Sequence, residues 1–213
     1  GDWFWMAPLY VEGIRDVALK DIQYAAAFGY RVKLLAIIKQ ENSNVEMRVH
    51  PALVPIESSL GGVGGVFNAV WVRGDPVGET MYYGRGAGRE ATASAVVADI
   101  VDVGLNVKFG SHRRVPAFRP HEGYARVVEM AEIVSRYYLR LQVQNRAGVL
   151  AKISGILGDR NISIASVRQQ EITGETAPLV LLTYESREKD MQEALVQLAR
   201  LDVRTGIGTV EHP

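Results

Sequence analysis

Short apolar segments separated by turn residues dominate the first half of the chain. The spacing of the apolar residues predicts a helix over residues 21–28, which ends at Gly29, and a largely buried strand over residues 32–38. Residues 45–49 alternate strictly between apolar and polar side chains, which predicts a half-exposed strand joined to the preceding one as a hairpin. After a glycine-rich loop at residues 61–65, two further strands are expected over residues 68–72 and 79–83.

The apolar period lengthens after these strands. From Thr92 onward the apolar residues recur at helical spacing on one face, at Ala93, Val96, Val97, Ile100 and Val101. Residues 111–119 are basic and show no period, so we expect a linker there, followed by a short helix around residues 122–134. The predicted division is therefore residues 1–110, a linker and short helix over 111–136, and a separate unit over 137–213.

The last 77 residues contain a complete set of elements for a small domain. Strands are predicted over residues 138–143, 162–169, 178–184 and 203–210, and helices over residues 149–157 and 189–200. The order of these elements is βαββαβ, which is typical of a ferredoxin-like split βαβ plait.

Composition narrows the classes of function. Lys plus Arg and Asp plus Glu number 24 each in the 213 residues, so the chain lacks the positive charge of a nonspecific nucleic-acid binder. The absence of cysteine excludes disulfides, thiolate metal sites and cysteine nucleophiles. No stretch reaches the roughly 20 uncharged apolar residues of a membrane span, and the apolar start lacks the basic region of a signal peptide. We expect neither nucleic acid nor membrane as a partner, and a cytoplasmic location.

The segment Asn145–Leu150 joins the first strand of the last unit to its first helix. Gly148 permits a close approach of the backbone, and the N–H groups at a helix start suit a carboxylate such as that of an amino acid. The spacing alone favours a simpler interpretation, in which Asn145 caps the helix and Gly148 serves the turn. Gln169 and Gln170 are either ligand-binding groups or solvent-facing strand residues.

The last third of the chain resembles an ACT domain. The resemblance rests on residues 139–153, which read Leu-Arg-Leu-Gln-Val-Gln-Asn-Arg-Ala-Gly-Val-Leu-Ala-Lys-Ile, and on Asn-Ile-Ser-Ile at 161–164. ACT domains sense amino acids and usually pair side by side, with the effector between the strand–helix loop of one copy and the second strand of its neighbour. The resemblance implies effector-binding residues at Asn145, Ala147, Gly148, Val149, Leu150 and Ile164.

Three segments of the first half resemble homoserine dehydrogenases, in the order in which that family carries them. They are Tyr10–Ile14 with Asp21–Ala25 and Gly29–Leu35, Val49–Pro55 with Phe67–Val70, and Tyr83–Gly88 with Thr92–Ile100. The family reduces aspartate semialdehyde to homoserine with NADPH or NADH, on the route to threonine, methionine and isoleucine. The resemblance implies an α+β fold, in which part of a mixed-sheet catalytic domain precedes a ferredoxin-like ACT domain with threonine as feedback effector.

The loop at residues 86–88 has a physical rationale as a cofactor contact. Small residues let the backbone approach a flat ring, and the helix start that follows favours anionic groups. In the family this loop returns to the nucleotide domain near the nicotinamide. The resemblance therefore implies cofactor contacts at Gly86, Ala87, Gly88 and Thr92. Without the resemblance, a glycine turn that only caps the helix explains the pattern as well.

Two features of the family are missing. The chain has no Gly-x-Gly-x-x-Gly fingerprint after an N-terminal strand, and no segment matching the one that holds the family's catalytic lysine. We expect the chain to begin after those residues and assign no catalytic residue and no metal. Other residues that could take a catalytic role are Lys33, Lys39 and Glu12, which we interpret as structural or solvated. The charges of Arg113 and Arg114 belong to the linker. The four histidines, His50, His112, His121 and His212, lack the spacing of metal ligands.

Two hypotheses about function remain. The first is the C-terminal portion of a homoserine dehydrogenase that is inactive on its own, and the second is a non-catalytic, amino-acid-sensing dimerisation module. Another ACT enzyme of amino-acid metabolism is disfavoured by the segment Gly86–Ile100. In either case we expect homo-oligomers, formed through the sheets of both parts and through the apolar stripe after Thr92, which would otherwise face water.

Overall fold

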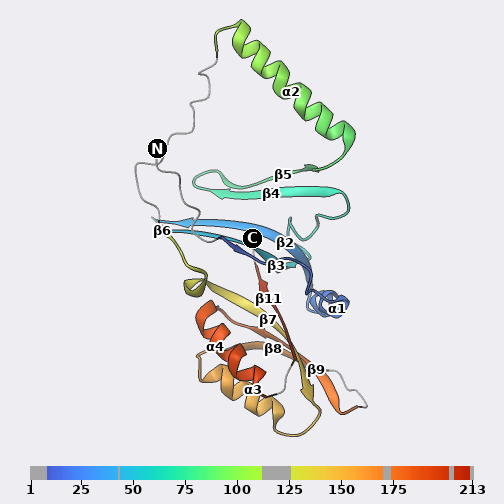
Figure 1. The fold of residues 1–213 in the computed structure, drawn as a ribbon, viewed down its shortest axis with the longest axis vertical. Helices are drawn as coiled ribbons and strands as arrows, with labels where there is room; N and C mark the ends of the chain where they lie inside the picture. The colour runs from blue at the N-terminus through green and yellow to red at the C-terminus, as the bar shows by residue number, and fades with distance from the viewer. Residues whose placement is uncertain (1–8, 43, 112–125, 170–173, 202–203, 212–213) are drawn as a thin grey trace. The chain divides into compact units, whose positions relative to one another are not determined.

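The computed structural model describes residues 9–42, 44–111, 126–169, 174–201 and 204–211 (Figure 1). The chain divides into two compact units, one formed by Gly1–Gly61 with Ala125–Pro213 and the other by Gly62–Tyr124. Helices accompany a nine-stranded mixed sheet and a separate two-stranded sheet, so the predicted α+β class is confirmed.

The centre of the first unit is β3 (Asn44–Pro55), a strand of 12 residues with neighbours along both edges. On one edge β2 (Tyr30–Glu41) pairs with it antiparallel over its whole length. On the other edge three short parallel pairings follow one another, with β6 (Arg126–Val127), β1 (Tyr10–Val11) and β11 (Arg204–Val210).

The three short pairings repeat at every fourth residue of β3. The carbonyls of Val45, Val49 and Leu53 accept hydrogen bonds from the N–H groups of Val128, Glu12 and Glu211, with donor–acceptor distances of 2.9, 2.8 and 3.0 Å. Three parts of the chain that are distant in sequence therefore complete one edge of a single strand.

Through β11 this sheet continues into the predicted plait. β11 pairs antiparallel with β7 (Val134–Gln144), β7 with β9 (Thr176–Thr183), and β9 with β8 (Ile164–Gln169). The helices α3 (Val149–Gly158) and α4 (Glu188–Ala199) complete the order βαββαβ. A short additional strand, β10 (Ser186–Arg187), pairs with β7. The ferredoxin-like plait is confirmed.

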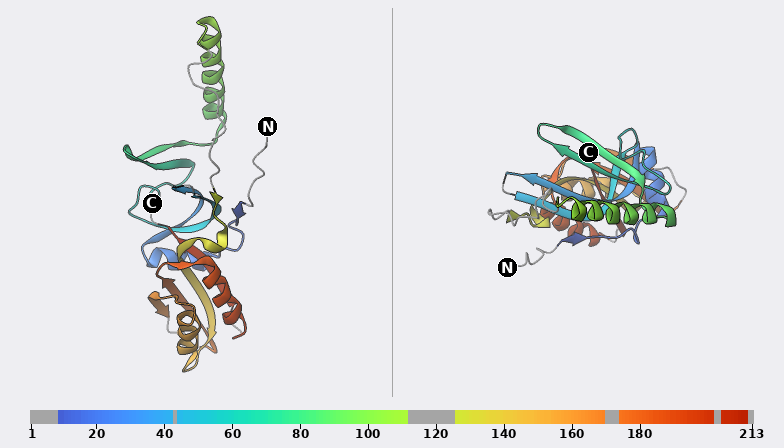
Figure 2. Two further views of the ribbon diagram at one scale, coloured as in Figure 1. Left: turned by 90° about the vertical axis from the view of Figure 1, so that its left-hand side faces the viewer. Right: turned by 90° about the horizontal axis from the view of Figure 1, so that it is seen from above.

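The two faces of the plait sheet bury separate cores. On one face lie α3 and α4 (Figure 2), and their contacts with the sheet form a core that includes Leu139, Leu141, Ile153, Leu157, Leu181, Met191 and Leu198. On the other face lies α1 (Leu19–Ala27), where Tyr24 and Ala25 meet Tyr138, Val180 and Leu182. Neighbouring residues of β7 and β9 thus point alternately to α1 and to the two plait helices.

The second unit consists of the hairpin β4 (Phe67–Gly74) and β5 (Gly78–Arg85), followed by α2 (Arg89–Lys108). The predicted strands and helix are present, each extended by a few residues. Within described residues 62–111, however, no hydrophobic side chain is buried. Of the helices that the structure describes, none has the length and apolar character needed to cross a membrane.

The prediction of a short helix around residues 122–134 is wrong for the part that the structure describes. Residues 126–127 form β6, Met130–Glu132 form a single 3₁₀ turn, and β7 begins at Val134. The free edge of β3 explains the difference, because it binds this segment as a strand before a helical turn can start. Residues 122–125 and the predicted linker residues 112–119 lie outside the described residues.

Candidate functional site

The glycine-rich loop between β5 and α2 forms one candidate site. Gly88 immediately precedes α2 and has a φ of 138°, a conformation that L side chains rarely adopt. An open hollow of about 480 Å³ surrounds it, lined by Arg85, Ala87, Gly88, Arg89, Glu90 and Ala91. The hollow lies at the start of a helix of 20 residues, where the N–H groups favour negative charge.

The four residues predicted for this site lie close together, but only two of them line the hollow. Ala87 and Gly88 line the hollow, whereas Gly86 and Thr92 do not. A Cβ atom at Gly86 would lie 2.0 Å from Nδ2 of Asn68, so that glycine keeps room for a side chain of the facing strand. Thr92 donates its N–H to the Gly88 carbonyl at 2.9 Å, as the first turn of α2 requires.

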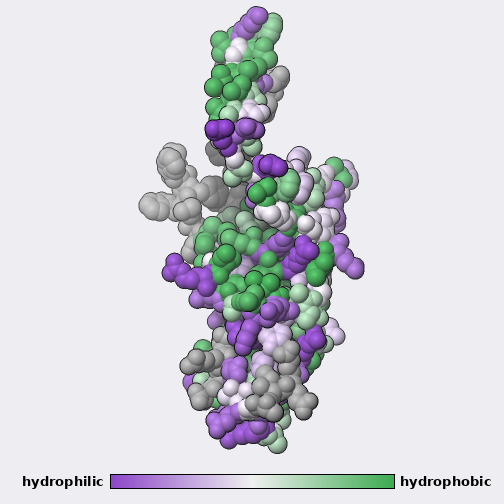
Figure 3. Space-filling view, turned by 90° about the vertical axis from the view of Figure 1, so that its right-hand side faces the viewer, coloured by the Kyte–Doolittle hydropathy of each residue, from purple (hydrophilic) through white to green (hydrophobic). Residues whose placement is uncertain are grey.

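Apolar side chains cover more of α2 than the predicted stripe. Val96, Val97, Ile100 and Val101 of that stripe are each at least 52% exposed. Val103, Leu105 and Val107 add further exposed apolar surface, and Figure 3 shows hydrophobic residues over much of the visible face of α2. Nothing among the described residues of this unit buries that surface.

The loop between β7 and α3 forms the second candidate site. Gly148 precedes α3 with a φ of 85°, in the left-handed region, and its carbonyl accepts the N–H of Lys152 at 3.1 Å. Asn145 does not cap the helix. Its backbone N–H donates to the Glu175 carbonyl at 2.8 Å, and its side-chain Nδ2 donates to the Gly174 carbonyl at 3.4 Å. The loop is therefore tied to the start of β9, and no side chain caps the first turn of α3.

The other predicted residues of this site fall into an exposed and a half-buried group. Ala147 is exposed and Leu150 is 40% exposed, so both are available to a ligand. Val149 and Ile164 are half-buried and pack against the same core beneath α3 and α4. Gln169 is exposed at the end of β8, and Gln170 lies outside the described residues.

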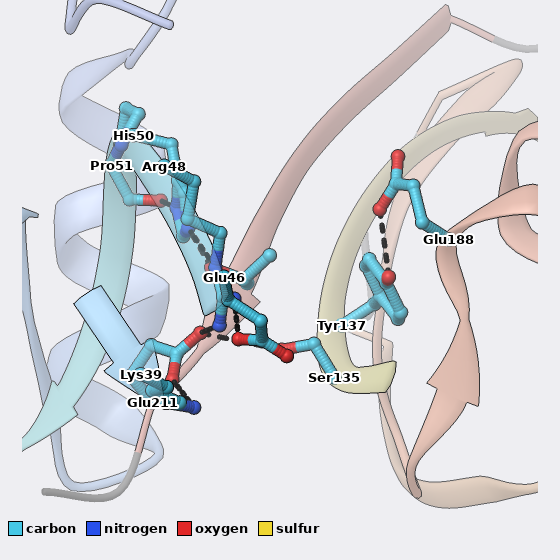
Figure 4. Close-up of polar contacts among 10 residues, drawn as sticks. Lys39, Glu46, Arg48, His50, Pro51, Ser135, Tyr137, Glu188 and Glu211 are labelled. Carbon is cyan, nitrogen blue, oxygen red and sulfur yellow. Dashed lines mark hydrogen bonds and ion pairs between the residues drawn. The ribbon is translucent and has the colours of Figure 1, made fainter. Parts of the chain in front are cut away.

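A buried ionic cluster on β3 was not anticipated from the sequence. Arg48 is only 1% exposed, and its guanidinium contacts the carboxylates of Glu46 and Glu211 and the ring of His50 (Figure 4). Nη2 of Arg48 lies 2.7 Å from Oε1 of Glu211, and Nζ of Lys39 lies 3.2 Å from the other oxygen of that carboxylate. Glu211 follows β11, so the cluster links the end of the plait sheet to β2 and β3.

In the ion pair of Arg48 and Glu211, the charges of neighbouring groups affect the pKa of each residue more than burial does. Burial alone would raise the pKa of Glu211, but Arg48 and Lys39 hold that pKa below its ordinary value of 4.5. Burial would lower the pKa of Arg48, but Glu211 and Glu46 raise it. Both groups therefore stay charged in the folded protein.

His50 is held in one neutral tautomer by the same cluster. Because Nε of Arg48 can only donate, Nε2 of His50 must accept, at 3.0 Å. This geometry assigns the proton to Nδ1, which lies 3.1 Å from the Pro51 carbonyl and 3.0 Å from Oγ1 of Thr209. Burial, reinforced by the charge of Arg48, lowers the pKa of His50 below its ordinary value of 6.5.

A second, half-buried ion pair joins α1 to β7. Asp21 accepts hydrogen bonds from Nε and Nη2 of Arg140 at 2.6 and 3.1 Å, and from the Tyr138 hydroxyl at 3.0 Å. The Ala18 N–H also donates to Asp21, at 2.9 Å. Burial would raise the pKa of Asp21, but Arg140 together with these donors holds it below its ordinary value of 3.8.

The remaining candidates have other partners or lie outside the described residues. Glu12 accepts a hydrogen bond from the Tyr10 hydroxyl at 2.8 Å, and Lys39 belongs to the Glu211 cluster. Lys33 is half-buried, and burial followed by the charge of Arg31 lowers its pKa. In the described part of the chain, no group of three His, Asp or Glu side chains could hold a metal ion. The structure does not describe His112, Arg113, Arg114, His121 and His212.

One signal for the Arg48 cluster was present in the sequence but was misinterpreted. Glu46, Arg48 and His50 alternate along one face of β3, and the alternation over residues 45–49 predicts a half-exposed strand. The structure shows instead that Arg48 and His50 are buried. The reason is Glu211, which lies 163 positions after Arg48 and supplies the opposite charge.

Comparisons with known proteins match both parts of the chain. Residues 3–101 match the family model described as homoserine dehydrogenase, and residues 137–203 match the ACT domain. Homoserine dehydrogenases from Neisseria gonorrhoeae and Pseudomonas aeruginosa are 43% and 41% identical to the chain, over 91% and 92% of its length. The chain spans less than half the length of these relatives, 45% and 46%.

Solved structures give the same result. A homoserine dehydrogenase from Thiobacillus denitrificans superposes with a TM-score of 0.86 at 41% identity, over 96% of this chain and 48% of that one. The enzyme from S. aureus superposes with a TM-score of 0.61 at 28% identity, over 94% of this chain and 46% of that one.

Replacing Arg48 tests the buried cluster. We expect Arg48→Met to lower the free energy of unfolding by about 3–5 kcal/mol, because it leaves the Glu211 carboxylate buried without its main partner. The matched control is Arg126→Met, whose partner Glu132 lies 2.8 Å away in a pair with side chains 62% and 52% exposed. That control should lose no more than about 1 kcal/mol. Urea unfolding followed by circular dichroism measures both, and equal losses would contradict the assignment.

The pH dependence of stability tests the state of His50. The unfolded chain binds a proton at His50 near its ordinary pKa of 6.5, whereas the folded chain resists it. The free energy of unfolding should therefore fall as the pH drops through that range. The contributions of Glu211 and Asp21, whose pKa values are also lowered, persist above 4.5 and 3.8 and are lost only at more acidic pH. In His50→Gln the decline between about pH 7.5 and about pH 5.5 should be shallower than in the parent chain. Parallel profiles would refute the neutral assignment.

Proposed function

Because the chain belongs to the homoserine dehydrogenase family, we propose that it supplies the later part of the catalytic domain and the ACT domain of a homoserine dehydrogenase. The whole enzyme would interconvert aspartate semialdehyde and homoserine with NADPH or NADH. The observation that supports this most is the superposition on the T. denitrificans enzyme over 96% of the chain. We propose residues 1–110 for the catalytic part, 111–136 for the linker and 137–213 for the ACT domain.

The Gly88 hollow fits a role as one wall of the nicotinamide site. The position of a Cβ at Gly88 has no atom within 4 Å, so a flat ring can approach the backbone there. Arg85 and Arg89 line the same hollow and offer positive charge to a phosphate, or N–H donors to a carboxamide oxygen. The cofactor supplies the hydride when bound, while Ala87 and Gly88 position it. We assign no residue of this chain to proton transfer.

The loop before α3 fits a role as an effector site for a small amino acid. The carboxylate would lie at the start of α3, where Gly148 precedes the first turn and no side chain caps it. Ala147, Val149 and Leu150 would face the ligand side chain, with Asn145 holding the loop in place. The neighbouring copy would add Ile164 from β8, which pairs only with β9 among the described strands and so leaves an edge for a second copy. Threonine is the proposed effector.

A second function is favoured by one observation. The plait has complete cores on both faces, whereas the described residues 62–111 bury no hydrophobic side chain. A folded sensor beside a catalytic part that lacks its covering surface would act as an amino-acid-sensing dimer without turnover. The two functions predict different results for a chain that is joined to a nucleotide-binding half. The first predicts turnover of aspartate semialdehyde, and the second predicts none.

A chimera tests the catalytic part of the proposal. We would fuse the half of the N. gonorrhoeae enzyme that this chain does not match to residue 1, and expect NADPH oxidation with aspartate semialdehyde. The 213-residue chain alone should show none. In the chimera Gly88→Ala should lower kcat/KM for NADPH about tenfold, because φ at Gly88 is 138°. Gly84→Ala is the matched control, since Gly84 has open space and no left-handed φ. Turnover by the chain alone, or equal effects of the two substitutions, would contradict the proposal.

Calorimetry tests the effector site. We expect the purified chain to bind L-threonine, and to bind L-isoleucine and L-methionine more weakly. Leu150→Asp should weaken threonine binding by more than about tenfold, because it replaces an apolar contact to the ligand side chain with a negative charge in the first turn of α3, close to the proposed carboxylate position. Val196→Asp adds the same charge to an exposed site on α4 and should change the affinity less than about twofold. Absence of heat with all three amino acids would argue against this effector class.

A further inference from the structure

Helix α1 is held at both ends by β7 and β8, the two plait strands that adjoin or carry the proposed effector residues. Near its start, Asp21 receives the forked hydrogen bonds of Arg140 on β7, at 2.6 and 3.1 Å. At its end, the carbonyl of Ala27 accepts a hydrogen bond from Nη1 of Arg168 on β8, at 3.2 Å. The same guanidinium lies 5.9 Å from the ring centre of Phe28, the residue that ends the helix.

Each of these strands connects directly to the proposed effector site. Asn145 follows β7 immediately, five residues after Arg140, which is about 17 Å along an extended strand. β8 begins at Ile164, four residues before Arg168. A ligand that shifts or stiffens the loop after β7, or the first residues of β8, therefore acts on strands whose arginines already hold α1.

The two faces of β7 have different partners, and only one of them contacts α1. Tyr138 and Arg140 point to α1, whereas Tyr137, Leu139 and Leu141 point to the core beneath α3 and α4. The Asp21 and Arg140 side chains are 11% and 21% exposed, so solvent screens the pair little. A forked pair of this kind requires both groups in one plane, and a small displacement of the strand would break one of its two bonds.

From α1, which itself belongs to residues 1–110, the path continues into the sheet of the catalytic part. Gly29, with a φ of 84°, turns the chain from α1 into β2, and β2 pairs with β3 over the whole length of both strands. A change in the position of α1 thus reaches the longest hairpin of the homoserine dehydrogenase part.

We propose that α1 is the element of the catalytic part on which the ACT domain acts: Arg140 and Arg168 act as positioning residues that make the hold on α1 depend on effector binding. The inference rests on the proposed effector site. Coupling free energies are reciprocal, so an effector that changes the hold on α1 also binds with an affinity that depends on that hold.

Hydrogen exchange of the full 213-residue chain, read by mass spectrometry with and without saturating L-threonine, tests the proposal. We expect threonine to change the exchange rate of the peptide covering residues 19–28 by at least about fivefold, within the usual range of allosteric coupling. In Arg140→Met and in Arg168→Met this response should fall below about twofold, while the peptide covering residues 145–151 still responds as in the parent chain. Retained response of that loop peptide also shows that the plait of the variant is folded.

Two further variants separate positioning from general stability. Gln142→Met changes a residue two positions beyond Arg140 on β7, whose side chain bonds to Thr176 at 2.9 Å rather than to α1, and should leave the α1 response unchanged. Arg140→Lys keeps the charge but loses the fork, and should give an intermediate response.

The possible outcomes distinguish a failure of the role of α1 from a failure of the effector site. A loop peptide that responds to threonine while the α1 peptide of the parent chain does not would overturn the proposal. So would an α1 response in Arg140→Met and Arg168→Met equal to that of the parent. If neither peptide responds and calorimetry shows no binding, the effector site itself is wrong, and the role of α1 falls with it.

Discussion

The edge of β3 that is shared by β6, β1 and β11 is the constraint on which the rest of the fold depends. A strand edge left open costs unpaired N–H and carbonyl groups and invites association. Here the edge is completed piece by piece, because Val45, Val49 and Leu53 each accept a hydrogen bond from a different part of the chain. β11 is the decisive piece, since it also pairs with β7 and thereby makes one sheet of the plait and the hairpin. The position of β11 also brings Glu211 to Arg48, whose burial would otherwise be unfavourable.

The elements that depend on neighbouring residues were predictable from the sequence. The helices of the plait, its four main strands and the hairpin of β2 and β3 follow from the spacing of apolar residues. Their bounds differ by a few positions, except that β3 continues well beyond the predicted residues 45–49, to Pro55. The elements that were missed are short strands, β1, β6 and β10, whose two residues carry no period of their own. They form because an edge already present binds them, and such an edge is a property of the assembled sheet.

The candidate sites also contain residues that could be predicted from the sequence and residues that could not. Gly88 and Gly148 could be predicted because residue type limits conformation: both precede helices and have positive φ values of 138° and 85°. The pairs Arg48–Glu211 and Asp21–Arg140 could not be predicted, because the partners are 163 and 119 positions apart. A polar residue on a strand face gives the same alternation whether water or a distant carboxylate solvates it, and only the tertiary structure distinguishes the two. Asn145 shows a smaller error of this kind, since its side chain bonds across to Gly174 and leaves the helix uncapped.

The long stretch of sequence between β3 and β11 also has a consequence during synthesis of the chain. At the usual rate of about 5–20 residues per second, roughly 8–30 s pass between the appearance of Arg48 and that of Glu211. Throughout that interval the nascent chain carries an open strand edge and a guanidinium without its main carboxylate, although β2 and β3 can already pair. Ribosome-bound intermediates of this protein should therefore be natural clients of chaperones that shield strand edges, until β11 is made and completes this edge of β3.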